Sequence, residues 1–472
     1  MKKALKQLAL FGLLSLTLVL GVSSIAAQGQ PGTDAPGVWG SSINLQNTGT
    51  GTATITIQFY DSSGTLVHTY TPDPLAAGGA VSIYVPGVVT GLASGQYSAV
   101  VSSDQPVIAS VNTGSTNSAT APWTSFAYDG FDQSQAGTTL YFPGNYKNYY
   151  NFYSEIVVQN TGSSTATLTG TFKKADGTVI ASNVAMGTLA PNASKTFPMS
   201  AFSQLPSGNA DGLFGAVISS DQPIVGVANI WREQPTNGTA SYSGFTGGSS
   251  TLYAPALYKE YYGFGSALTI QNVGTGTATG TVTYSNGTTK NFSLAEGAAI
   301  EFYQPADPAL PGGNTNGVFA ASVTATSGQV VGLVSLSIPT GTNGDFASYN
   351  VPSSAATSVN IPNVNSDYYG FFSAVTVQNT DTSQSTNVTI TYADNTSRTF
   401  NNIPPGGVVN IIHLNGAGDT LPDKTSTSAV VSSSNGVNLV AVIQHNTASG
   451  VNGYDPSKVP SDFLQAVTGV TP

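Results

Sequence analysis

Apolar and polar residues alternate with a period of two along much of the chain. Between Thr52 and Phe59, the odd-numbered positions are Ala, Ile, Ile and Phe, and the even-numbered positions are Thr or Gln. The segment 165–172 shows the same alternation. This pattern predicts half-buried antiparallel strands. Gly, Asn and Asp residues follow at matching places, and they predict hairpin turns at 61–64, 176–177, 286–287 and 394–395.

The alternating segments belong to a fourfold internal repeat. A strand ending in Gln-Asn recurs with its Gln at positions 46, 159, 271 and 378, so the periods are 113, 112 and 107 residues. About 110 residues with seven or eight short strands suit two sheets packed face to face. We therefore expect an all-β protein of four tandem immunoglobulin-like antiparallel β-sandwiches. The expected parts are a signal peptide at 1–27, repeats at 28–137, 138–250, 251–357 and 358–458, and a C-terminal tail at 459–472.

An aromatic-rich leader precedes the Gln-Asn strand in the last three repeats. We consider two roles for these rings: packing the joint between neighbouring repeats, which we favour, or stacking on a glycan. The leader aromatics are Tyr146, Tyr149, Tyr150, Phe152, Tyr258, Tyr261, Tyr262, Phe264, Tyr368, Tyr369 and Phe371.

The Asn residue of each Gln-Asn pair is expected to organise the turn that follows it. An Asn side chain at a strand end commonly bonds to nearby backbone groups, so this role is preferred to a ligand site repeated four times. The residues concerned are Asn47, Asn160, Asn272 and Asn379.

A strand ending in Asn, a Gly-containing turn and a Thr/Val alternating strand resemble the N-x-G signature of bacterial immunoglobulin-like adhesion domains, including the CARDB-like group. The resemblance covers the core of each repeat and not the leader. It implies a sandwich fold, and it leaves open a role as spacer, binder or stalk.

The first 27 residues have the layout of a secretory signal peptide. Lys2, Lys3 and Lys6 precede an apolar run from Leu8 to Val22, and small residues follow. The run is shorter than the roughly 20 residues that a membrane span needs. We therefore expect a secreted, extracellular or cell-surface protein with no membrane span in its mature chain. Cleavage after Ala27 would leave 10 basic and 23 acidic residues, a net charge of −13.

Composition narrows the function further. Charged residues make up only 8% of the chain and cysteine is absent. The acidic balance argues against nucleic acid as a partner, and the lack of cysteine excludes disulfides and thiolate metal sites. His68, His413 and His445 do not recur between repeats, and no catalytic or calcium-loop motif is present. We expect no enzyme activity, no catalytic residue, no metal site and no cofactor.

Two surface features remain. Asn286 and Asn395 lie in N-x-S/T sequons at predicted hairpin tips, where a glycan could be attached. The tail from Pro460 to Pro472 sits where a fifth leader would begin, and head-to-tail docking of this tail would build a filament.

Together these features predict a secreted, non-catalytic structural protein of the cell surface: an adhesin, a stalk or a filament subunit. The expected partners are further copies of the chain, other surface proteins or glycans. The alternative is an array of carbohydrate-binding modules that acts through the leader aromatics.

Overall fold

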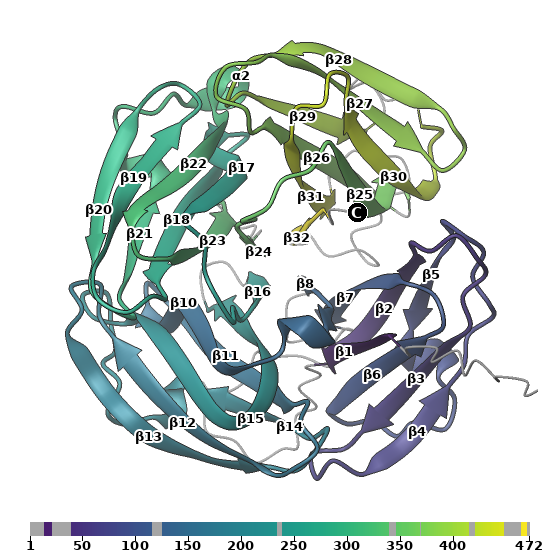
Figure 1. Ribbon diagram of the computed structural model, residues 1–472, viewed down its shortest axis with the longest axis vertical. Helices are drawn as coiled ribbons and strands as arrows, with labels where there is room; N and C mark the ends of the chain where they lie inside the picture. The colour runs from purple at the N-terminus through teal and green to yellow at the C-terminus, as the bar shows by residue number, and fades with distance from the viewer. Residues whose placement is uncertain are drawn as a thin grey trace, which may run out of the picture.

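In the computed structural model, the chain forms antiparallel β-sheets arranged in a closed ring (Figure 1). The structure describes residues 14–20, 39–115, 125–233, 238–338, 346–368, 370–414, 421–447 and 464–469. The all-β sandwich fold expected from the alternating pattern is therefore confirmed. Each sequence repeat contributes two facing sheets, and we call such a pair a unit.

In each of the last three units, one sheet contains the strand formed by the leader segment, and in the first unit residues 14–20 form the corresponding strand. We call this sheet the leader sheet. Its strand order is β4-β3-β6-β1-β9 in the first unit, β13-β12-β15-β10 in the second, β20-β19-β22-β17 in the third and β25-β30-β27-β28 in the fourth. The strands are β1 (Leu14–Leu20), β3 (Ile55–Tyr60), β4 (Leu66–Tyr70), β6 (Tyr97–Ser103), β9 (Phe131–Asp132), β10 (Gly137–Tyr149), β12 (Ala166–Lys173), β13 (Val179–Leu189), β15 (Leu213–Arg232), β17 (Thr251–Tyr261), β19 (Ala278–Tyr284), β20 (Thr289–Leu294), β22 (Val318–Ser327), β25 (Ser358–Ser366), β27 (Thr386–Tyr392), β28 (Ser397–Ile403) and β30 (Thr425–Ser433).

The other sheet of each unit contains the Gln-Asn strand and ends at the centre of the ring, so we call it the axial sheet (Figure 1). The Gln-Asn strands β2, β11, β18 and β26 pair antiparallel with their neighbours. The strands are β2 (Trp39–Asn47), β5 (Ala80–Tyr84), β7 (Val107–Ser115), β8 (Ser125–Asp129), β11 (Phe152–Asn160), β14 (Ser194–Pro198), β16 (Thr239–Ser243), β18 (Phe264–Asn272), β21 (Ala299–Tyr303), β23 (Val330–Ser337), β24 (Phe346–Asn350), β26 (Phe371–Asn379), β29 (Val408–His413), β31 (Leu439–Thr447) and β32 (Leu464–Thr468).

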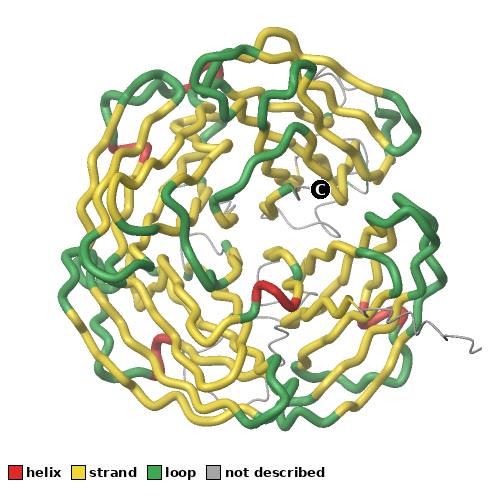
Figure 2. The backbone as a smooth tube through the Cα atoms, in the orientation of Figure 1, coloured by secondary structure: helices red, strands yellow, loops and turns green. Residues whose placement is uncertain are grey.

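Among the described residues, helical structure is confined to single turns in connections between strands (Figure 2). These turns are α1 (Val85–Val88), α2 (Gly313–Asn316), η1 (Gln133–Gln135), η2 (Met199–Ala201) and η3 (Gln304–Ala306).

The predicted hairpins are present, and the connection that leads to the axial sheet differs between the first and second units. The turns at 61–64, 176–177, 286–287 and 394–395 each join two paired strands. The short segment from Asp104 to Pro106 separates β6 from β7. The matching segment of the second repeat, Ser220 to Pro223, lies inside the single strand β15. That strand pairs with β12 in its first half and with β11 in its second half, so it joins the two sheets.

Burial differs between the two kinds of sheet. Strands β3 and β27 of the leader sheets alternate between buried and less buried positions. In contrast, β11, β18 and β26 are buried almost without interruption up to their final Asn. The axial sheets are covered on both faces: one face meets the leader sheet of the same unit, and the other meets the preceding unit.

The hydrophobic cores consequently run across the joints. The first core includes Val157 and Trp231 of the second unit, and the second includes Leu333 and Phe346 of the third. The third core includes Val442 and Ala466 of the fourth unit. The fourth core includes Ala127 of the first unit, which completes the circuit.

The centre of the ring is formed by one strand from each unit: β8, β16, β24 and β32. Each contacts the next, and β32 contacts β8. Strand β32 pairs antiparallel with β31, as β8 pairs with β7 in the first unit. The prediction of a separate tail at 459–472 is therefore wrong for Leu464–Thr468, because these residues form the last strand of the fourth unit. The sequence does not mark this strand, because Val467 takes the position that Tyr128, Tyr242 or Tyr349 holds in the other units.

The Asn residues of the Gln-Asn pairs bond to the following turn, as predicted. In the third unit, the Asn272 side chain donates to the carbonyls of Gly276 and Leu294 at 2.7 and 3.0 Å and accepts from the Gly274 amide at 2.9 Å. Asn47, Asn160 and Asn379 make the corresponding bonds. Each Asn thus holds a turn against the end of a neighbouring strand.

Replacing Asn272 with Ala should destabilise the third unit by about 1–3 kcal/mol, because the carbonyl of the buried Leu294 and two backbone groups of the turn lose their side-chain partner. Thermal and urea unfolding would measure this loss. Asn286→Ala, at an exposed hairpin tip, is the control and should change little. Equal effects of the two changes would contradict this role for Asn272.

Deleting residues 460–472 removes β32 and the bond from Thr468 Oγ1 to Asp129 Oδ2 (2.7 Å) that links the last unit to the first. We expect the ring to open, so that the radius of gyration measured by X-ray scattering increases. Deleting only 470–472 keeps β32 and should leave the radius unchanged. A 460–472 deletion with the original radius would show that β32 does not close the ring.

Candidate ligand-binding pocket between the second and third units

The leader aromatics lie on tight hairpins that connect the two sheets of a unit. Strands β10 and β11 are joined at Tyr150 and Asn151, whose φ angles are +49° and +64°. Strands β17 and β18 are joined in the same way at Tyr262 and Gly263, with φ angles of +49° and +85°. A tyrosine rarely adopts positive φ, so both hairpins hold a bulky side chain at a position that favours Gly or Asn.

At the β10–β11 hairpin of the second unit, the aromatic rings contact the third unit. Tyr146 stacks on Tyr149 with ring centres 6.0 Å apart, and it contacts Phe152 at 5.7 Å. Phe152 contacts Phe346 of the third unit at 5.0 Å. Tyr150 packs edge-on against Tyr149 at 4.9 Å and is 54% exposed, so its ring stands at the surface.

These rings line a pocket of about 430 Å³ at the joint. The second unit contributes Tyr146, Tyr149, Tyr150, Phe152 and Arg232, and the third unit contributes residues of β18, β21, β23 and β24. The third-unit residues are Ala267, Glu301, Tyr303, Ser335, Ser337 and Phe346.

Two charged residues lie among the aromatic walls. Burial raises the pKa of the Glu301 carboxyl to about 7, because the charged form loses its water. Arg232 lies over the Phe152 ring at 5.2 Å, and burial lowers the pKa of its guanidinium. Burial, reinforced by the charge of Glu301, raises the pKa of the Tyr149 hydroxyl to about 12. The pocket can therefore offer an acceptor, a cationic donor and phenol groups to one ligand.

The next joint repeats the aromatic rings and has an uncharged residue in place of Glu301. Tyr258 stacks on Tyr261 at 5.6 Å, and its hydroxyl donates to Gln444 Oε1 of the fourth unit at 2.8 Å. Phe264 packs against Tyr258 at 6.2 Å. Strand register places Asn410 at the position of Glu301, because each pairs with the equivalent Thr of its Gln-Asn strand. Tyr262 is 65% exposed, like Tyr150.

The fourth leader also forms a hairpin. Tyr368 and Phe371 form an isolated bridge across their hairpin, and Tyr368 is 38% exposed. Tyr369 lies outside the described residues. The leader residues of the second and third units therefore lie at the joints, and their rings form stacked clusters there.

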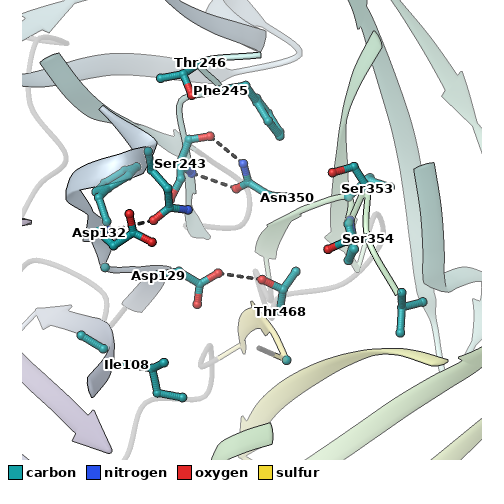
Figure 3. A pocket seen from close by; sticks show the side chains of 18 of the residues that line it. Ile108, Asp129, Asp132, Ser243, Phe245, Thr246, Asn350, Ser353, Ser354 and Thr468 are labelled. Atoms are coloured by element: carbon teal, nitrogen blue, oxygen red, sulfur yellow. Dashed lines mark hydrogen bonds between the residues drawn. The ribbon is translucent and has the colours of Figure 1, made fainter. Parts of the chain in front are cut away.

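A second cavity, of about 490 Å³, lies where the axial strands end (Figure 3). Asp129, Ser243, Asn350 and Thr468 occupy equivalent positions of the four units around it. Thr468 bonds to Asp129, and Asn350 exchanges two bonds with the Ser243 backbone at 2.9 and 2.7 Å. Burial raises the pKa of Asp129 to about 6. Because these polar groups bond to each other across the unit boundaries, we attribute to them a role in ring closure.

The sequence did not predict that two histidines would meet. His413 Nε2 lies 2.8 Å from the Tyr392 hydroxyl, and His445 Nδ1 lies 2.9 Å from Ser373 Oγ. Burial and the neighbouring His413 lower the pKa of His445 to about 4. All four side chains are buried, and Ser373 also accepts from the Asn365 amide at 2.8 Å. The cluster is enclosed in the fourth unit, so it has the character of a core network.

The other predicted features have simple positions. Asn286 and Asn395 are exposed at the tips of the β19–β20 and β27–β28 hairpins. Within the part of the chain that the structure describes, no group of three or more His, Asp or Glu side chains could hold a metal ion. The same residues include no helix long and apolar enough to cross a membrane.

No protein-family model matches the sequence, and no curated protein matches it. Among solved structures, Thermotoga maritima 1070 is 17% identical, with a TM-score of 0.20 over 23% of this chain and 93% of its own. The Anabaena sensory rhodopsin transducer is 20% identical, with a TM-score of 0.17 over 19% and 92%. The pilus backbone RrgB of Streptococcus pneumoniae is 10% identical, with a TM-score of 0.12 over 77% and 86%. These similarities are too low to assign a function, and the CARDB-like resemblance stays a prediction.

Replacing Glu301 with Gln should change how stability depends on pH. The folded-state pKa of about 7 lies above that of an unfolded glutamate, so the folded protein binds this proton more tightly. The cost of burying the charge is therefore absent near pH 4, grows as the pH rises and is complete above pH 7. We expect E301Q to unfold at the same temperature as the wild type near pH 4 and at a higher temperature at pH 8. The free energy of unfolding at pH 8 should be larger for E301Q by roughly 1–3 kcal/mol.

Thermal unfolding of both proteins between pH 4 and 8 would measure this difference. Asp129 and His445 titrate in both proteins, so their contributions cancel in the comparison. Parallel stability curves for the two proteins would contradict a half-buried Glu301 whose charged form is poorly solvated.

Proposed function

We propose that this chain is an exported, non-catalytic protein of the cell surface that binds saccharides in the pocket between its second and third units. The observation that carries the proposal is a desolvated carboxylate, Glu301, set among aromatic rings in a cavity of about 430 Å³. A concave, largely aromatic site with a few convergent polar groups is the usual form of a small-molecule site.

A saccharide suits this combination of groups. The apolar C–H face of a sugar ring packs on an aromatic face, and Tyr150 and Tyr303 are the most exposed rings of the pocket. Sugar hydroxyls both donate and accept, so they can use the Glu301 carboxylate and the Arg232 guanidinium together. The cavity is large enough for the terminal one or two sugars of a glycan. This size is suited to a protein that binds the ends of glycans at a surface.

The closed ring bears on the other surface roles. A compact ring with a binding pocket is compatible with an adhesin. A head-to-tail filament would need the residues around β32, and these pair with β31 and contact β8 within the same chain. The filament and the stalk are therefore less favoured by this geometry than a saccharide-binding adhesin.

Tyr150→Asn should weaken saccharide binding by at least about tenfold, because a stacking ring is lost from the pocket. Asn tolerates the positive φ of this position, so the hairpin should persist. Tyr262→Asn is the matched control, since the equivalent ring stands at the joint where Asn410 replaces Glu301. Calorimetric titration with a panel of neutral, amino and acidic saccharides would measure the affinities.

Two results would count against the proposal. If the wild-type protein bound no member of the panel, the pocket would not be a saccharide site. If Y150N and Y262N lost affinity equally, binding would depend on the shared aromatic hairpins and not on the pocket that contains Glu301.

A further inference from the structure

The apolar run near the N-terminus forms a strand of the first unit. Strand β1 pairs antiparallel with β6 over seven residues, from Leu14 opposite Ser103 to Leu20 opposite Tyr97. On its other side, Leu16 lies opposite Asp132 and Thr17 opposite Phe131. The segment thus lies inside the leader sheet with a neighbour on each edge.

This position is filled by the leader strand in every other unit. Leu16 pairs with Val101, and Leu140, Leu252 and Val359 pair with the equivalent residues of β15, β22 and β30. The second neighbour is also matched, because the bridge from Tyr141 to Phe245 corresponds to the pair formed by Thr17 and Phe131. Strand β1 therefore has the register of a leader strand.

The sequence of the segment agrees with this position. Residues 14–20 read Leu-Ser-Leu-Thr-Leu-Val-Leu, so leucine occupies every second position. Period-two alternation is the pattern of a strand with one buried face, and a membrane-crossing run does not need it. The first repeat has no aromatic leader directly before its Gln-Asn strand, so the place of the leader strand is left for another segment.

We propose that the first unit holds a strand-acceptor groove between β6 and β9, and that its occupant is the chain's own residues 14–20. The segment remains seated there when the chain is cut between residues 21 and 38. The same residues are the apolar run of the predicted signal peptide, so one segment serves as an export signal and as a structural strand.

An empty groove would be costly to the protein. The backbone groups of β6 that face β1 would lose their ladder partners, and an open strand edge is a template for pairing with another chain. The segment also contributes to the ring, because β1 contacts β11 and β15 of the second unit. The other leader strands make the same kind of contact, as β10 does with β18 and β17 with β26.

A disulfide test can establish the register, because the chain contains no cysteine. Full-length protein that keeps residues 1–27 would carry Ser15→Cys with Ser102→Cys, which are opposite each other in the two strands. The control pairs Ser15→Cys with Val100→Cys, two residues out of register. We expect at least about fivefold more disulfide in the matched pair, because a disulfide requires Cα atoms closer than about 7 Å. Equal yields would overturn the proposed pairing.

A second experiment tests retention and needs no substitution in the groove. A specific protease site placed between Gln30 and Ala35 would allow the folded full-length protein to be cut. We expect the N-terminal peptide to co-elute with the ring in native size exclusion and to separate only in denaturant. Release of the peptide with no fall in the unfolding temperature would overturn the proposal. Release with a new dimer would also overturn it, because a second copy would then be the occupant.

Discussion

The ring depends on the burial of each axial sheet from both sides. Strands β11, β18 and β26 meet their own leader sheet on one face and the preceding unit on the other. A sheet that is covered on both faces has no solvent side, so its polar residues must find partners within the protein. Gln271 and Gln378 illustrate this, because each donates across a joint to the preceding unit, to the Ala216 carbonyl and to Ser322 Oγ. The Gln-Asn pair therefore joins two tasks: Asn fixes a turn, and Gln helps to hold the joint.

The sequence predicted the local structure well. Alternation and turn residues are local properties, so the strands, the hairpins and the Asn-bonded turns could be read directly. The ring could not be read, because it depends on the angle between neighbouring units and on which strand completes the last one. One signal was present: Ile156, Val157 and Val158 form an unbroken apolar run, which indicates burial on both faces. The tail was misplaced because β32 lacks the tyrosine that marks the axial strands of the other units.

The candidate pocket was predicted in part. Its aromatic half is conspicuous in the sequence, since the rings are clustered and repeated. Glu301 and Arg232 are not, because each occurs in one unit and lies in an ordinary strand far along the chain from the β10–β11 hairpin and its tyrosines. Only the packing of β21 beneath the β10–β11 hairpin brings them together. The repeat therefore predicts the fold and does not predict the charged part of the site, because those residues lie where one copy differs from the others.

Because the hydrophobic cores are shared around the whole ring, the ring affects where unfolding can begin. A linear array of repeats has two terminal units, which fray first and need polar caps on their outer faces. Here the core of the fourth unit takes in Ala127 of the first, so no unit is terminal. A chain without ends to protect has less need of charged capping surfaces, which fits a protein in which only 8% of residues are charged. Unfolding then has no preferred starting point at an end, and it must begin by breaking a joint.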